Sequence, residues 1–168
     1  MKVITADPSA CTACRSCEAA CATYHEGTPN GLYSRIRVLA FMRTPEPYLF
    51  YPHVCMQCET PYCAMVCAPG ALQKNKETGV IEYSREKCIG CKLCVVACPY
   101  GAMTMHDGVP AKCDLCDGDP QCVKACTFDA IKFGEPEKLA QDKRVVISRA
   151  MQEGRSVSQI QKQPKVRV

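Results

Sequence analysis

The sequence has no tryptophan and only four phenylalanines, so a large aromatic core is excluded. It also has no long hydrophobic run, since a stretch such as 38–42 is far shorter than the roughly 18 residues that a membrane-spanning helix requires. Residues 1–11 hold one lysine but no apolar segment, no paired arginines and no small-residue cleavage site. We therefore expect a chain that is neither exported nor membrane-spanning.

An excess of charge of one sign is also missing from most of the chain. Residues 1–134 hold 13 basic and 13 acidic side chains, whereas residues 135–168 hold eight basic and four acidic ones, which accounts for the whole net charge of +4. Scattered basic residues interleaved with acidic ones are not typical of nucleic-acid binding, for which proteins use clustered basic residues. The pattern favours a solvated helix face and a docking segment, with no nucleic-acid partner.

Cysteine, by contrast, is abundant, at 16 of 168 residues. The cysteines form four quartets that each begin with Cys-x2-Cys and end with Cys-x3-Cys, and none is left over. In chain order the quartets are Cys11, Cys14, Cys17 and Cys21; Cys55, Cys58, Cys63 and Cys67; Cys88, Cys91, Cys94 and Cys98; and Cys113, Cys116, Cys122 and Cys126. The third quartet, followed by Pro99, matches the bacterial run Cys-x2-Cys-x2-Cys-x3-Cys-Pro that binds iron–sulfur clusters.

Three kinds of site use cysteine at this density. Disulfide frameworks belong mainly to short secreted chains, and no export signal is expected here. Structural zinc uses two Cys-x2-Cys pairs separated by a dozen or more residues, rather than three cysteines at three-residue steps. A cubane cluster takes four thiolates, of which one tight loop supplies three. We therefore predict four [4Fe–4S] clusters held by all 16 cysteines. Zinc, disulfides, a three-iron cluster and a vacant site stay open as alternatives.

The repeat extends beyond the cysteines. A Val-Ile pair begins eight residues before the first cysteine in quartets one and three, and quartets two, three and four place Ala and then an apolar residue shortly after their last cysteine. These apolar pieces predict short edge strands, and the Cys-x3-Cys segments predict the beginnings of short helices. Quartet one departs from the pattern, because an alternating run at 34–42 predicts a strand in an insertion that ends at 44–47.

The composition changes after Phe133. Pro136 lies near a predicted helix start, with acidic residues in the first turn, and Gly154 is a plausible stop. The apolar residues of this segment recur on one face, namely Leu139, Val146, Ile147, Ala150 and Met151. The segment is therefore predicted to be an amphipathic helix, and residues 155–168 are too polar to form a core alone.

The sequence offers no catalytic machinery of its own. With every thiol committed to a cluster, none is free as a nucleophile, and no glycine-rich dinucleotide fingerprint or spare ligand set for an open metal is present. His25, His53 and His106 are isolated in the sequence. We expect them to have surface or supporting roles rather than to bind metal. The predicted function is conduction of electrons, with no catalytic residues.

The residue directly after the second cysteine differs in charge between quartets. It is basic in quartets one and three (Arg15 and Lys92, respectively) but acidic in quartets two and four (Glu59 and Asp117, respectively). A nearby cation favours a reduced cluster and an anion disfavours it, so these side chains could separate the cluster potentials. The alternative is that all four are solvated and screened surface charges.

The four quartets resemble those of the four-cluster iron–sulfur subunits of complex oxidoreductases, with tight gaps in the first and third and wider gaps in the second and fourth. That family includes the electron-transfer subunits paired with dimethyl sulfoxide reductase-type molybdenum enzymes, formate hydrogenlyase, carbon monoxide dehydrogenase and tungsten aldehyde oxidoreductase. The resemblance covers residues 1–134, and its motifs specify cluster binding much more than the partner. In length and tail the chain looks most like the small subunit of a tungsten aldehyde oxidoreductase.

The resemblance implies an α+β fold of two nested bacterial dicluster ferredoxin-like modules, with small antiparallel sheets and short helices, plus a C-terminal helical tail. Residues 1–44 and 113–134 would form the outer module, residues 45–112 the inner module, and residues 135–168 the helix and docking tail. It also implies ligand sets that cross between quartets. These sets are Cys11, Cys14, Cys17 and Cys126; Cys113, Cys116, Cys122 and Cys21; Cys55, Cys58, Cys63 and Cys98; and Cys88, Cys91, Cys94 and Cys67.

The function implied by the resemblance is that of a cytoplasmic electron-transfer subunit in a hetero-oligomer. Its expected partners are a large catalytic subunit with a tungsten- or molybdenum-pterin, best matched by an aldehyde oxidoreductase, and a second redox subunit, flavin- or NAD-linked, or a soluble ferredoxin. Two alternatives stay open. One is a free polyferredoxin that carries electrons between enzymes, and the other is a subunit of a formate dehydrogenase, hydrogenase or carbon monoxide dehydrogenase complex.

Overall fold

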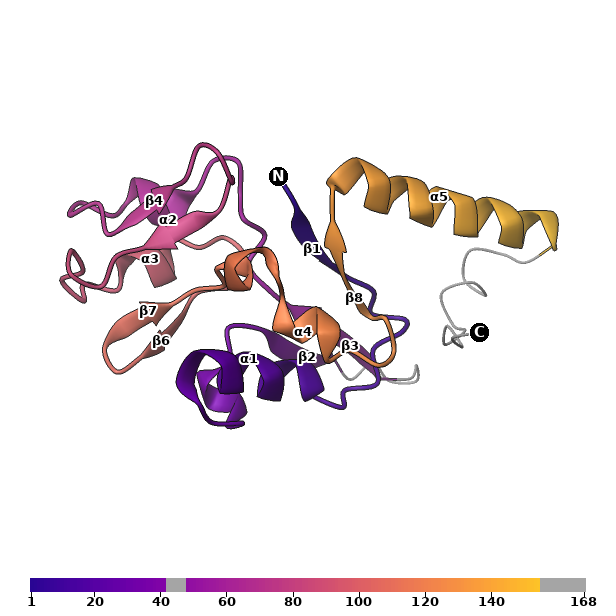
Figure 1. The fold of residues 1–168 in the computed structure, drawn as a ribbon, viewed down its shortest axis with the longest axis horizontal. Helices are drawn as coiled ribbons and strands as arrows, with labels where there is room; N and C mark the ends of the chain where they lie inside the picture. Colours follow the sequence, from indigo (N-terminus) through magenta and orange to yellow (C-terminus); the bar gives the residue numbers. More distant parts are fainter. Residues whose placement is uncertain (42–47, 155–168) are drawn as a thin grey trace.

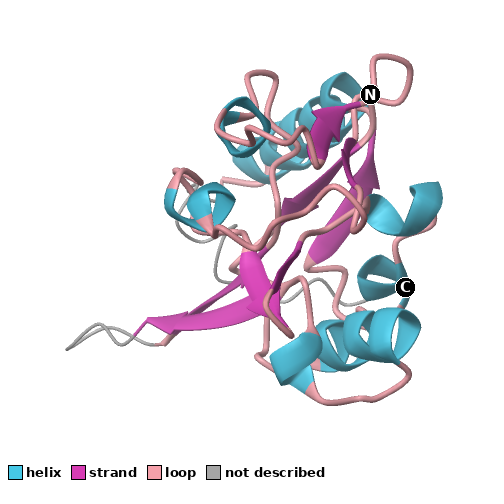
Figure 2. Cartoon of the chain, turned by 90° about the vertical axis from the view of Figure 1, so that its left-hand side faces the viewer, coloured by secondary structure: helices cyan, strands magenta, loops and turns pink. Residues whose placement is uncertain are grey.

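The computed structural model describes residues 1–41 and 48–154. Within them the strands form four separate two-stranded antiparallel sheets. Figure 2 shows these short strands and the helices separated by loops, without one large sheet. The expected combination of small antiparallel sheets and short helices is confirmed. The end of the predicted insertion at 44–47 and the segment 155–168 lie outside the described residues.

The first and last strands of the cysteine-containing part pair with each other. β1 (Val3–Ala6) lies antiparallel to β8 (Ile131–Gly134), with Val3 opposite Gly134 and Ala6 opposite Ile131. Figure 1 shows the two strands side by side at the centre of the molecule, although about 125 residues separate them in sequence. This pairing brings the flanks of quartets one and four together.

The helices after the cysteine loops differ in length. α1 (Ser16–Glu26) has 11 residues, whereas α2 (Tyr62–Met65), α3 (Leu93–Val96) and α4 (Gln121–Lys124) have four residues each. Two 3-10 turns, Gly31–Tyr33 and Leu115–Gly118, complete the helical segments. α1 ends at Gly27, whose left-handed φ of 67° lets its N–H reach the Thr23 carbonyl. Quartet one is therefore the exception that its sequence indicated.

The remaining strands form three hairpins. The longest pairs β2 (Arg37–Phe41) with β3 (Leu49–His53), and β2 lies within the strand predicted at 34–42. The other two pair β4 (Leu72–Lys74) with β5 (Ile81–Tyr83), and β6 (Thr104–His106) with β7 (Val109–Ala111). The apolar residues of the repeat are buried both in the β1–β8 pair, as at Ile4 and Ile131, and in the β4–β5 hairpin, as at Leu72 and Ile81.

Two apolar cores result, and they define two regions. The outer region (residues 1–41, 48–54 and 113–134) contains the larger core, which includes Ile36, Val38 and Ile131. The inner region (residues 55–112) contains a smaller core built around Leu72, Ile81 and Met103. In Figure 1 the inner region lies on the left and the elements of the outer region lie around the centre. Cysteines line both cores, although Cys14 and Cys91 are exposed.

The C-terminal helix begins as predicted. α5 (Pro136–Gln152) has Pro136 at its first turn, and the methyl groups of Leu139 pack near Gly134 of β8. Of its predicted apolar face, Leu139 and Ala150 are buried, whereas Val146, Ile147 and Met151 are exposed. Over the described ranges, no helix is both long and apolar enough to cross a membrane.

Candidate metal centres

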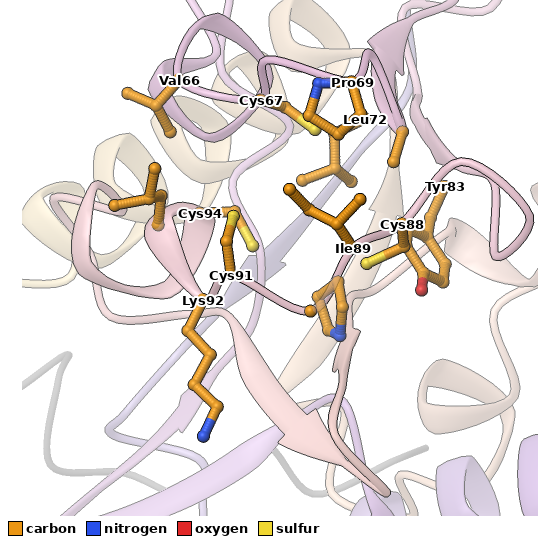
Figure 3. Close-up of a pocket in the computed structure, with 14 residues that line it drawn as sticks. Val66, Cys67, Pro69, Leu72, Tyr83, Cys88, Ile89, Cys91, Lys92 and Cys94 are labelled. Atoms are coloured by element: carbon orange, nitrogen blue, oxygen red, sulfur yellow. The ribbon is translucent and has the colours of Figure 1, made fainter.

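Three cavities are each lined by four cysteines, three from one quartet and one from another. Site A contains Cys11, Cys14, Cys17 and Cys126; site B contains Cys55, Cys58, Cys63 and Cys98; and site C contains Cys67, Cys88, Cys91 and Cys94. Figure 3 shows the four cysteines of site C around one cavity, with Leu72 and Ile89 beside them.

The four remaining cysteines form a fourth group, site D, made of Cys21, Cys113, Cys116 and Cys122. All four are buried. Cys21 lies on α1, which packs against α4 and its Cys122. Burial raises the pKa of the Cys122 thiol, and the nearby thiolates of Cys113, Cys21, Cys116 and Cys17 add to that effect. Cys21 therefore lies with quartet four, although quartet one lacks the flanking pattern of the other three.

Each cysteine loop contains a left-handed residue at the same position. The residue immediately before the second cysteine has a positive φ in all four quartets: Ala13 (58°), Gln57 (49°), Gly90 (70°) and Leu115 (62°). Only glycine adopts this conformation at little cost, so three of the loops hold an unfavourable backbone geometry. Successive N–H groups in such turns converge and favour an anion. A cluster with four thiolates is such an anion, and the loops fit it.

A second recurring turn follows three of the quartets. The third residue after the last cysteine also has a positive φ at Gly70 (67°), Gly101 (62°) and Asp129 (52°). The equivalent residue of quartet one is Tyr24, which lies inside α1. The long helix therefore replaces the turn, and it carries Cys21 toward quartet four instead of beginning a strand.

The thiols differ in exposure and in pKa. Burial raises the pKa of Cys17 and of Cys113 to about 12, whereas hydrogen bonding from Ser16 lowers the pKa of the exposed Cys14. Because metal ligation requires the thiolate, binding of a cluster by the buried cysteines must release their thiol protons. No disulfide joins any of the 16 cysteines, all of which lie in the described part of the chain.

One of the three histidines lies beside these sites. His25 Nε2 is 3.8 Å from Cys116 Sγ and 3.5 Å from Asp114 Oδ1, and ligand atoms of these three residues all lie within 4.8 Å of one another. Asp114 also accepts a hydrogen bond from Arg35 Nη1 at 2.7 Å. Burial lowers the pKa of His25, and Asp114 opposes that effect. The side chain is thus in contact with site D, a neighbourhood that its sequence position could not reveal.

The other two histidines have aromatic neighbours. His106 packs edge-on against Tyr33, with ring centroids 5.3 Å apart, and His53 lies near Tyr51 on β3.

The backbone N–H of Arg35 donates to Cys21 Sγ at 3.3 Å, and that of Ala102 donates to Cys98 Sγ at 3.4 Å. Such N–H···S contacts are among the features that tune bound iron–sulfur clusters.

Known protein families match the two parts of the chain that hold these loops. The 4Fe-4S dicluster domain family matches residues 47–136, which is more than half of the chain, and a 4Fe-4S binding domain family matches residues 8–24. The two matches cover quartets two to four and quartet one, respectively.

Curated relatives extend the similarity. The chain is 36% identical to the electron transport protein HydN of Escherichia coli over 167 residues, covering 83% of this chain and 91% of HydN. It is 36% identical to one subunit of the anaerobic dimethyl sulfoxide reductase of Escherichia coli, covering 79% of this chain and 73% of that subunit. It is 40% identical to the beta subunit of NADH-dependent phenylglyoxylate dehydrogenase of Aromatoleum evansii, over 77% of this chain but only 29% of the longer relative.

Proposed function

Because the chain belongs to the 4Fe-4S dicluster domain family, we propose that it is an electron-transfer subunit carrying four [4Fe–4S] clusters. The observation that supports this best is the convergence of thiols in fours, with three from one loop and one from another. Sites A and D would join quartets one and four, and sites B and C would join quartets two and three. This is the crossed arrangement expected of two nested modules.

The chain's own residues hold, shield and polarise these sites. Each bound cluster would accept and donate one electron at a potential that its surroundings set. The left-handed residues Ala13, Gly90 and Leu115 donate backbone hydrogen bonds to Cys11, Cys88 and Cys113, respectively. The two apolar cores border the sites. Site D is enclosed by four buried cysteines, whereas Cys14 of site A and Cys91 of site C are exposed. Electrons would therefore enter or leave most readily at sites A and C.

The names of the relatives support a role in a larger complex. One is a subunit of a reductase, one a beta subunit of a dehydrogenase and one an electron transport protein. We propose a large pterin-containing catalytic partner, with a tungsten aldehyde oxidoreductase as the specific candidate, and a second redox subunit or a soluble ferredoxin as the other electron partner. The exposed Val146, Ile147 and Met151 of α5 are suited to contact such a subunit. A free electron carrier is the competing function.

The test is anaerobic purification of the full chain from its native source, with metal analysis and size-exclusion chromatography. We expect about 16 iron and 16 sulfide per chain, from four cubanes, and elution with a large subunit that contains a pterin. Zinc in place of iron would contradict the clusters. A fully loaded chain that elutes near 18.5 kDa would instead support the free carrier.

A further inference from the structure

Lys112, at the junction of the two regions, is buried. It follows β7 and precedes Cys113, and it is 5% exposed. Lysine is almost never fully buried without a compensating partner, because an isolated ammonium group loses its hydration. Lys92, beside site C, is by contrast exposed.

The direct partners of Lys112 are neutral. Its Nζ donates to Gln57 Oε1 at 3.0 Å and to the Cys113 carbonyl oxygen at 2.7 Å. An ammonium group has three N–H donors, so these two bonds leave one unaccounted for. Within residues 1–41 and 48–154, no carboxylate forms an ion pair with it.

Gln57 explains how the ammonium is held. This side chain is 1% exposed, and its left-handed backbone (φ 49°) turns it inward from the first loop of quartet two. Its Nε2 donates to the Cys113 carbonyl at 2.8 Å, and its Oε1 also accepts from Ile81 N at 3.1 Å. The network therefore ties the loop of site B to the cysteine that begins the loop of site D.

The groups near Lys112 that gain negative charge on metal binding are cysteine thiols. Lys112 lines the cavity of site B. Burial raises the pKa of the Cys58 and Cys63 thiols, and the Lys112 ammonium opposes that effect at both. It also opposes the effect of burial on the pKa of Cys113. These three cysteines belong to the two sites that lie on either side of the network.

We infer that Lys112 is a positioning residue and buried counter-charge, shared by sites B and D, that stabilises the reduced state of the clusters held there. The inference rests on the proposed function, because a counter-charge of this kind needs an anion at each site. A cluster gains negative charge on reduction, and a cation without a carboxylate partner is attracted more strongly to the reduced form. Burial removes the solvent screening that weakens surface charges.

The test is an anaerobic redox titration of the full-length holo-protein, followed by electron paramagnetic resonance, for Lys112→Gln, Lys112→Met and Lys112→Arg. Glutamine keeps a hydrogen-bond donor without charge, and arginine keeps the charge. We expect both neutral variants to lower two of the four midpoint potentials, with the equilibrium constant for reduction falling about tenfold at the more sensitive site, which is about 59 mV for one electron. Arginine should retain most of the wild-type values. Lys92→Met, which removes an exposed cation beside Cys91, is the matched control and should cause a smaller shift.

The outcomes separate this inference from the proposed function. Absence of iron from the wild-type protein would refute the clusters themselves. Wild-type loading with unchanged potentials in Lys112→Gln would refute only the counter-charge. If the neutral variants fail to load iron, loading of Lys112→Arg supports a requirement for the charge, whereas failure of all three variants would show that Lys112 acts by packing.

Discussion

The outer and inner regions contain the same cysteine loops in different surroundings. In the outer region α1 spans 11 residues, and the buried Glu18 on it accepts a hydrogen bond from Val38 N at 2.6 Å. In the inner region the helices have four residues, and large side chains such as Val96, Ile89 and Met65 are exposed. The loop repeat thus supplies three cysteines of each site, while the elements around it bring in the fourth and decide how well the site is enclosed.

The two regions should depend on metal to different extents. A two-stranded hairpin is marginal by itself in water, and the inner region has two short ones over a small core. The outer region has a larger core and closes with the β1–β8 pair. Crossed ligand sets would join segments far apart in sequence, so cluster assembly and folding should be one event.

Removal of iron should have the largest effect. We expect the apo-chain to be largely unfolded, because the apolar cores of both regions are lined by the cysteines that would hold the clusters. Circular dichroism before and after anaerobic chelation measures the loss, and hydrogen exchange locates what persists. Any residual protection should lie in α1, β1 and β8 rather than in the inner region. A native-like spectrum after complete iron removal would contradict the coupling.

Substitution of a crossing cysteine should affect one site only. In Cys126→Ser we expect the thiols of Cys11, Cys14 and Cys17 to become open to alkylation in the holo-protein, since site A loses its fourth ligand. Peptide mass spectrometry after anaerobic labelling identifies the modified cysteines. The reciprocal control is Cys21→Ser, which should expose the thiols of Cys113, Cys116 and Cys122 instead. Exposure of quartet four in Cys126→Ser would show that the sets do not cross.

The sequence predicted features within each loop better than it predicted contacts between residues far apart in the chain. Spacing within a quartet constrains one loop, so the three-cysteine loops, the flanking apolar pieces and the exceptional quartet one could be predicted from it. The fourth cysteine of each set was expected only from the family resemblance. The contact of His25 with Cys116 could not, because 91 residues separate them. The network of Gln57 and Lys112 spans 55 residues and was missed for the same reason. Contacts of this kind depend on how the two regions pack, which no local spacing encodes.

The charges after the second cysteines should have the smallest effect. Arg15, Glu59, Lys92 and Asp117 are all exposed, and Glu59 is paired with Lys74 at 2.8 Å, which favours the screened alternative. Lys92→Glu should lower the potential of site C by only about 10–40 mV, the scale of a surface charge interaction converted for one electron. The shift should shrink at high salt, because solvent ions reach this side chain.

Redox titration of Lys92→Glu at low and high ionic strength, with Lys92→Arg as the control that keeps the charge, measures this effect. Lys112 lies at the junction of the two regions, whereas Lys92 lies on the exposed surface of the inner one. Lys92→Glu changes the charge by two units and Lys112→Gln by one. Because Lys112 is buried, its smaller change of charge should nevertheless shift the cluster potentials more. A salt-independent shift at site C larger than that of Lys112→Gln would mean that exposure does not decide which cations set the potentials.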